Sequence, residues 1–130
     1  MTRIIIPGTL PGLNEYIDAE RSNKYAAARL KKNAQELIVR HIRYQASVAY
    51  AAPVVVAIRW MEPNRKRDKD NIAFAKKFIL DALREAGTIG GDGWCHIEGF
   101  QDHFGVVGEG DDPFIEVQVI PLDEYYDLPA

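Results

Sequence analysis

The alternation of apolar and polar residues predicts four strands and two helices along this chain. The segments with strand character are residues 3–6, 53–62, 97–107 and 114–120. In the last of these, Glu116 and Gln118 alternate with apolar neighbours, so we expect that strand to have one solvated face. Residues 7–14 contain two Pro and two Gly, which indicates a loop.

Apolar residues at helical spacing predict a long amphipathic helix over residues 22–48 and a second helix over residues 71–86. Basic side chains occupy the opposite face of the first helix: Arg29, Lys32, Arg40 and Arg43. Gly87 is well placed to end the second helix in the left-handed conformation. The order strand, helix, strand, helix, strand, strand indicates a single α+β domain over residues 1–130. We expect a mixed four-stranded sheet with both helices on one face.

Composition sets limits on the class of protein. The apolar fraction of 47% and the charged fraction of 27% are those of an ordinary globular domain. The chain lacks a run of 18 apolar residues, so we expect no membrane partner. The single cysteine, Cys95, excludes an internal disulfide framework, and a cytoplasmic protein is the simplest interpretation.

Charge is unevenly distributed, although the net charge is only −3. Residues 21–84 carry 15 Lys and Arg against five acids, whereas residues 108–130 carry seven acids and no Lys or Arg. The central segment can therefore present a basic surface, which suggests a polyanionic partner for one face of the molecule. Basic residues on solvated helices are common, so charge alone leaves this open.

Candidate metal ligands stand where the second predicted strand gives way to the second predicted helix. Asp68 and Asp70 are two residues apart in a basic run, and Asp92 stands in the Gly-rich loop after the helix. If that loop folds back, the three carboxylates could bind Mg²⁺, or Mn²⁺ in its place, because hard cations prefer oxygen ligands. Such an ion can activate water and stabilise charge on a phosphodiester. The structural alternative is that Asp68 and Asp70 are solvated loop acids and that Asp70 caps the helix.

A longer motif with ordered spacing resembles the RusA family of Holliday junction resolvases. It consists of Arg67-Asp68-Lys69-Asp70-Asn71, a lysine, Leu80-Asp81-Ala82-Leu83, Ala86-Gly87 and Asp92. The similarity is strongest from Trp60 to Asp92. The resemblance implies a small homodimer that uses Mg²⁺ to make paired nicks in four-way DNA, with Asp68, Asp70 and Asp92 as catalytic metal ligands.

The family's catalytic lysine is less easily placed. It usually lies four residues after the second acid, where this chain has Phe74. Counting back from Asp81 gives Lys77 instead, about one helical turn later, and Lys76 is the rival. We favour Lys77; its structural alternative is an ion pair with Asp81. Family members often carry two adjacent acids at the third ligand, whereas Asp92 stands alone here.

Three functions follow as hypotheses. The first is a Mg²⁺-dependent endodeoxyribonuclease for branched DNA, active in recombination and repair, with phosphates held by basic residues: Arg65, Lys66, Arg67, Lys69 and Lys76. The second is a non-catalytic module of the same fold that binds branched DNA. The third is a metal-dependent hydrolase of small phosphate esters, which the basic central segment disfavours.

Overall fold

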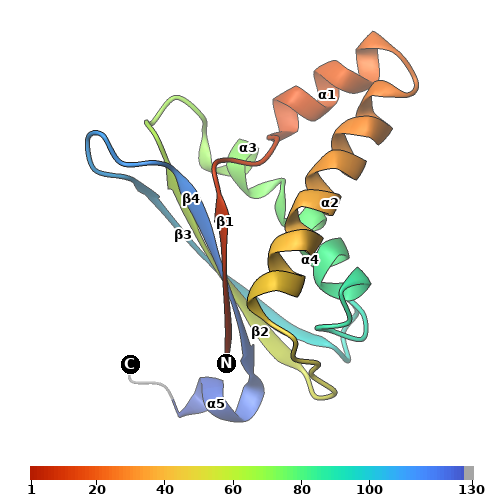
Figure 1. Ribbon diagram of the computed structural model, residues 1–130, viewed down its shortest axis with the longest axis vertical. Coiled ribbons are helices and arrows are strands. Elements are labelled where there is room, and N and C mark those ends of the chain that lie inside the picture. The colour runs from red at the N-terminus through yellow and green to blue at the C-terminus, as the bar shows by residue number, and fades with distance from the viewer. Residues whose placement is uncertain (128–130) are drawn as a thin grey trace.

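Four strands form one mixed sheet in the order β1-β4-β2-β3 (Figure 1). The strands are β1 (Thr2–Pro7), β2 (Val54–Glu62), β3 (Ile97–Val106) and β4 (Phe114–Pro121). β4 pairs antiparallel with β1 and with β2, whereas β2 and β3 run parallel. The computed structural model describes residues 1–127, so 128–130 of the predicted domain lie outside it. The predicted α+β class and mixed four-stranded sheet are confirmed.

The helices lie mainly on one side of this sheet, as predicted (Figure 1). They are α1 (Leu13–Ser22), α2 (Ala26–Gln45), α3 (Lys69–Ala73), α4 (Lys76–Glu85) and α5 (Leu122–Tyr126). α2 and α4 pack against each other and cover the sheet, while α5 lies at the end of the sheet near the N-terminus. Because β2 and β3 are parallel, α3 and α4 form the crossover connection between them.

The core fills the space between the sheet and helices α2 and α4. Its largest fully buried side chains include Trp60 and Ile58 of β2, Phe78 of α4 and Ile38 of α2. The helical spacing seen in the sequence is borne out, since Ala27, Ala34, Ile38 and Ile42 are buried on α2, as are Ile79 and Leu83 on α4. This packing fixes the crossover against the sheet and thereby places the ends of α3 and α4.

The helix α1 was not predicted. Its start lies in the segment that Pro and Gly marked as a loop, and it contains no buried residue that would have given a clear apolar stripe. The N-terminus of α1 is capped by a residue from another helix, because the side-chain oxygen of Asn71 in α3 accepts a hydrogen bond from the Asn14 amide at 2.9 Å. A cap supplied by a residue far away in sequence leaves no local signal.

The predicted helix over residues 71–86 is two helices. Between α3 and α4, the amides of Ala75 and Lys77 bond to carbonyls three residues back, those of Ile72 and Phe74. This tight turn interrupts the α-helical ladder and changes the direction of the chain. The predicted C-terminus is correct: Gly87 has φ +80°, and the amides of Gly87 and Thr88 bond to Arg84 and Leu83 carbonyls in a Schellman motif.

Glu116 departs from the expected solvated face of β4. It is buried although it lies on the side of the sheet away from the core, because Arg3 of β1 and Arg59 of β2 cover it. Arg3 Nη2 lies 2.5 Å from Glu116 Oε2, and Arg59 Nη1 lies 3.7 Å from Oε1. The two arginines thus neutralise a carboxylate whose burial would otherwise be costly.

Within residues 1–127, every helix is too short or too polar to cross a lipid bilayer.

Candidate metal-binding and nucleic-acid-binding site

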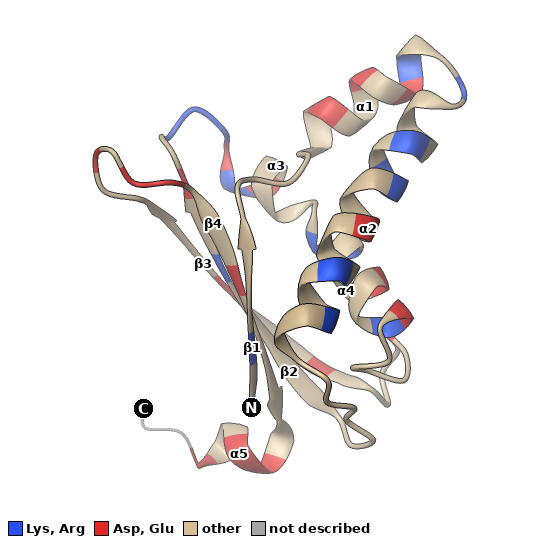
Figure 2. Cartoon of the chain, in the orientation of Figure 1, with Lys and Arg blue, Asp and Glu red and all other residues tan. Residues whose placement is uncertain are grey.

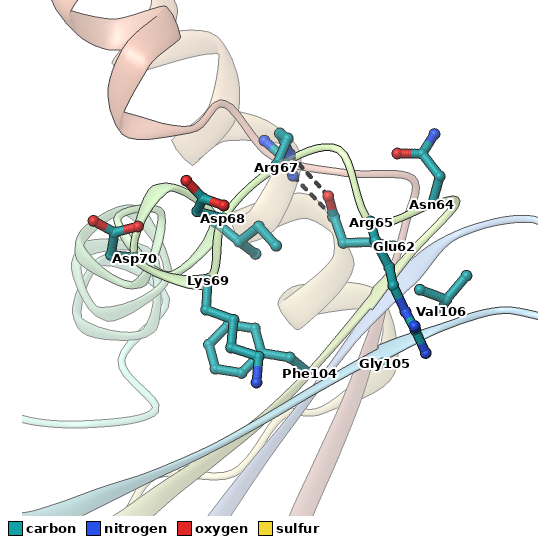
Figure 3. Close-up of a pocket in the computed structure, with 11 residues that line it drawn as sticks. Glu62, Asn64, Arg65, Arg67, Asp68, Lys69, Asp70, Phe104, Gly105 and Val106 are labelled. Atoms are coloured by element: carbon teal, nitrogen blue, oxygen red, sulfur yellow. Dashed lines mark hydrogen bonds and ion pairs between the residues drawn. The ribbon is translucent and has the colours of Figure 1, made fainter.

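A pocket of about 600 Å³ opens where β2 passes into α3, beside the end of β3 (Figure 3). Charged residues of the connecting segment form its rim, and side chains of α3 and β3 form its apolar floor. The lining residues that carry the argument are Arg65, Asp68, Lys69, Asp70, Ile72 and Phe104. The pocket therefore contains most of the candidate residues that the sequence singled out.

Asp68 and Asp70 both line this pocket and both are exposed. Asp68 is the residue before α3, but its side chain makes no capping hydrogen bond. Asp70 lies in the first turn of α3, where its Oδ1 accepts the amide of Asn71 at 2.9 Å. The alternative in which Asp70 caps the helix is wrong, because α3 begins at Lys69 and Asp70 lies within its first turn. Both carboxylates are exposed and open to a ligand.

The basic residues of this segment differ in whether they are exposed or paired with an acid. Arg65, Lys66 and Lys69 are exposed. Arg67 instead forms a bidentate ion pair with buried Glu62, with 2.8 Å for both nitrogen–oxygen contacts, and it also donates to the Leu10 carbonyl at 2.9 Å. The hydrogen bond to Glu62 raises the pKa of Arg67 above its ordinary value. Arg67 therefore holds the segment to the body of the domain, while its neighbours face solvent.

Asn71 connects this segment to the N-terminal loop. Besides capping α1, its side chain lies so close to Gly12 that a β-carbon at Gly12 would come within 2.5 Å of Asn71 Oδ1. Glycine is therefore required at this contact for steric reasons. The Asn71 side chain therefore caps α1, while the Asn71 backbone amide donates to the Asp70 carboxylate.

The Gly-rich loop folds back against α4 and places Asp92 within reach of Lys77, in the first turn of that helix, and of Arg84, in its last turn. Asp92 Oδ2 lies 3.5 Å from Lys77 Nζ, and Asp92 Oδ1 lies 3.9 Å from Arg84 Nη1. The ring of His96 packs against the loop so closely that β-carbons at Gly90 and Gly91 would approach it to 2.9 and 2.8 Å. The glycines thus allow the imidazole to support the loop that carries Asp92.

Lys77 lies between two carboxylates. Its Nζ is 3.2 Å from Asp81 Oδ1 and 3.5 Å from Asp92 Oδ2. Asp81 is buried and also pairs with Lys31 of α2 at 3.3 Å, while its Oδ1 has no well-directed hydrogen bond. Contact with Asp81 is the main cause that raises the pKa of Lys77 above its ordinary 10.5, and Asp92 adds to this effect.

Lys76 has a different environment from Lys77. Its Nζ lies 2.5 Å from Asp102 Oδ2 and 4.6 Å from the centre of the Phe100 ring. Asp102 also accepts a hydrogen bond from the indole of Trp60 at 2.9 Å. Lys76 thus connects α4 to β3 and to a core tryptophan. Lys77, which is 57% exposed, is the lysine that contacts a predicted metal ligand.

The structure brings Asp68 and Asp70 together but does not join Asp92 to them. Within residues 1–127, no group of three or more His, Cys, Asp or Glu side chains is arranged to hold a metal ion. Two exposed carboxylates at one pocket nevertheless fit Mg²⁺, which commonly takes one or two protein carboxylates and completes its shell with water and substrate phosphate. Asp68 and Asp70 are therefore the residues that could contribute carboxylate ligands in this conformation.

Several residues that shape this site were missed from the sequence: Glu62, Phe104, Asp102 and His96. Glu62 is an acid at the end of the largely buried strand β2, which was an available signal that a cation must lie nearby. Asp102 lies on β3, where no residue is fully buried, so it gave no such signal. The contact of His96 with Gly90 and Gly91 has no such signal, because it depends on how the loop folds.

The distribution of charge supports the uneven pattern seen in the sequence (Figure 2). Lys and Arg gather on α2 and on the segment between β2 and α3, whereas Asp and Glu mark the β3–β4 loop and α5.

Neither a scan of protein-family models nor a search of curated proteins finds a match for this chain. The resemblance to the RusA family therefore remains a prediction from the motif.

Proposed function

We propose that this protein is a Mg²⁺-dependent endodeoxyribonuclease that acts on branched DNA, as the RusA-like motif suggests. The observation that carries the proposal is the pocket in which two exposed carboxylates, Asp68 and Asp70, adjoin the cations Arg65 and Lys69. Acids that hold a metal beside bases that hold phosphates are the two requirements of metal-assisted phosphodiester hydrolysis.

Each group has a distinct task in this proposal. Asp68 and Asp70 would hold Mg²⁺, or Mn²⁺ in its place, and the ion would supply Lewis-acid stabilisation of the scissile phosphate and an activated water. Arg65, Lys66 and Lys69 bind the DNA backbone through charge and so position the substrate without reading its sequence. Lys77 keeps its proton and contributes a fixed positive charge near Asp92.

The test is nicking of a labelled four-way junction, with a linear duplex beside it, in Mg²⁺, in Mn²⁺ and in EDTA. We expect metal-dependent nicks in the junction, and we expect Asp68→Asn and Asp70→Asn to lower the rate by two orders of magnitude or more. Glu109→Gln, an exposed acid on the β3–β4 loop, is the matched control and should leave the rate unchanged. Retained nicking in both Asp variants would overturn the metal assignment.

The motif also implies paired nicks, and paired nicks need two active sites. We therefore include a homodimer in the proposal, with the two sites related by a two-fold axis that matches the symmetry of a junction. Sedimentation velocity of the free protein tests this part separately. If the protein is a monomer and makes one nick per binding event, the nuclease assignment stands and the homodimer is ruled out.

A non-catalytic module that binds branched DNA is the second candidate. The observation that favours it is the position of Asp92, which pairs with Lys77 and Arg84 instead of joining Asp68 and Asp70. This alternative predicts junction binding that weakens steeply with salt, and no nicking with any divalent metal. The nicking assay above decides between the two candidates.

A further inference from the structure

The pocket beside Asp68 and Asp70 has a feature that phosphate binding does not need, namely an apolar floor. Buried Ile72 of α3 and half-buried Phe104 of β3 form it, and the more exposed Val106 also lines the pocket. Its volume of about 600 Å³ lies within the range of pockets that bind small organic molecules. A site for backbone phosphates alone would require only an exposed basic surface.

Phe104 is held in a fixed orientation at this floor. Its ring stacks on the ring of Trp60, with the planes 12° apart and the centres 6.4 Å apart. Trp60 is buried and is fixed in turn by its hydrogen bond to Asp102, which Lys76 also holds. The ring that faces the pocket is therefore preorganised, which reduces the entropy lost when a second planar group stacks on it.

One cation lies over this ring, and a second lies elsewhere along the pocket lining. The ammonium of Lys69 lies 5.8 Å from the centre of the Phe104 ring. Figure 3 shows Lys69 beside Phe104, and Arg65 reaching toward Gly105 and Val106. An exposed cation–π contact contributes little energy. Lys69 can therefore leave the ring for a phosphate at small cost, while Arg65 provides a second charge across the pocket.

We propose that this pocket binds one unpaired base of a DNA strand, stacked on Phe104, with the adjoining phosphates held by Lys69 and Arg65. A base in a duplex has both faces covered by its neighbours, whereas a base at a branch point can leave the stack. A planar aromatic platform beside positive charges is suited to such a base of any sequence. This inference rests on the proposed function, because it takes DNA as the partner and assigns the substrate feature that the site selects.

The experiment compares two four-way junctions that differ at one position of the branch point. One carries an unpaired thymine there, and the other carries an abasic residue. Binding is measured by fluorescence anisotropy in EDTA, so that cleavage does not interfere. The wild-type protein should bind the thymine junction at least about 5-fold more tightly, the factor that corresponds to about 1 kcal/mol of stacking.

Variants then test the assignment to Phe104. Phe104→Leu, which keeps an apolar side chain against Trp60, should bind both junctions with equal affinity. Phe100→Ala is the matched control, because Phe100 lies on the same strand and the same face but does not line the pocket; it should keep the preference. Lys69→Gln should weaken binding of both junctions and reduce the salt dependence by about one phosphate contact.

Three outcomes would overturn the proposal. They are equal binding of both junctions by the wild type, loss of the preference in Phe100→Ala as complete as in Phe104→Leu, and dissociation of a dimer by Phe104→Leu. The last would show that a second copy of the chain covers the pocket. Failure of the proposed nuclease is distinguished from failure of the base pocket. A preference for the thymine junction without nicking in Mg²⁺ would support the base pocket and contradict the nuclease. Nicking without that preference would support the nuclease and contradict the base pocket.

Discussion

Lys77 and Asp92 contact each other at 3.5 Å, although one begins α4 and the other follows its end in sequence. The contact exists because the Gly-rich loop runs back along the helix, supported by the ring of His96 against Gly90 and Gly91. Asp92 also lies 3.9 Å from Arg84 in the last turn of α4, so it pairs with cations of this helix and does not join Asp68 and Asp70. Lys76, the neighbour of Lys77 in sequence, faces β3 instead.

Because Lys77 and Lys76 have different environments, we expect their removal to affect the protein in different ways. Lys77→Met should lower the nicking rate by about 10²-fold, the usual effect of removing one group that stabilises transition-state charge. It should also lower the free energy of unfolding, because it leaves buried Asp81 with Lys31 as its remaining lysine partner. Lys76→Met should lower the free energy of unfolding by about 1–2 kcal/mol, because it removes the partner of a partly buried carboxylate. Nicking rates and thermal melts of both variants are the measurements. A larger loss of nicking in Lys76→Met than in Lys77→Met would assign the site lysine to position 76.

The pH dependence of activity should show no ionisation of Lys77 in the neutral range. The carboxylates beside it raise its pKa above 10.5, so this cation and its favourable contacts are fully present below pH 10.5 and are lost only as pH rises through the higher folded-state pKa. The ratio of wild-type to Lys77→Arg nicking rates should therefore be constant from pH 7 to about pH 10. A ratio that changes with an inflection between these values would identify Lys77 as a proton-transfer group.

The cap that Asn71 provides to α1 predicts a measurable stability effect outside the metal site. Asn71→Ala should lower the free energy of unfolding by about 1 kcal/mol, since it removes the acceptor for the Asn14 amide. Gly12→Ala should have a similar effect, because the new β-carbon would clash with the same side chain. If one contact explains both, the double variant will lose less than the sum of the two single variants in urea unfolding.

Burial of Glu116 between two arginines predicts an effect on the face of the sheet that α1–α4 do not cover. Glu116→Ala should lower the free energy of unfolding by about 1–2 kcal/mol, because it leaves Arg3 and Arg59 as adjacent like charges. Glu109→Ala, an exposed acid in the β3–β4 loop, provides the control and should change it by less than about 0.5 kcal/mol. Equal unfolding midpoints for the two variants in urea would contradict the structural role of Glu116.

The regular elements were predictable because a buried face leaves a period in the sequence. The strands and the apolar stripes of α2 and α4 were found in this way, as was the left-handed Gly87. α1 and the break before α4 were not found, because one depends on a distant cap and the other on a local turn that leaves the apolar spacing almost unchanged. Likewise, the sequence identified Asp68, Asp70 and Asp92 as candidates, but it could not show that Lys77 and Arg84 hold the third apart from the first two.

Because of the break between α3 and α4, the two helices of the crossover are anchored to the core to different extents. α4 is fixed by six consecutive buried residues, Phe78–Leu83, whereas α3 has five residues of which only Ile72 is buried. Changes of length or sequence in the short helix can therefore alter the distance between the acids and Lys77 while the long helix keeps its place in the core. The distance between the two acids and Lys77 can therefore change without disturbing the core. In an engineered chain, insertions after Ala73 are the way to vary this distance.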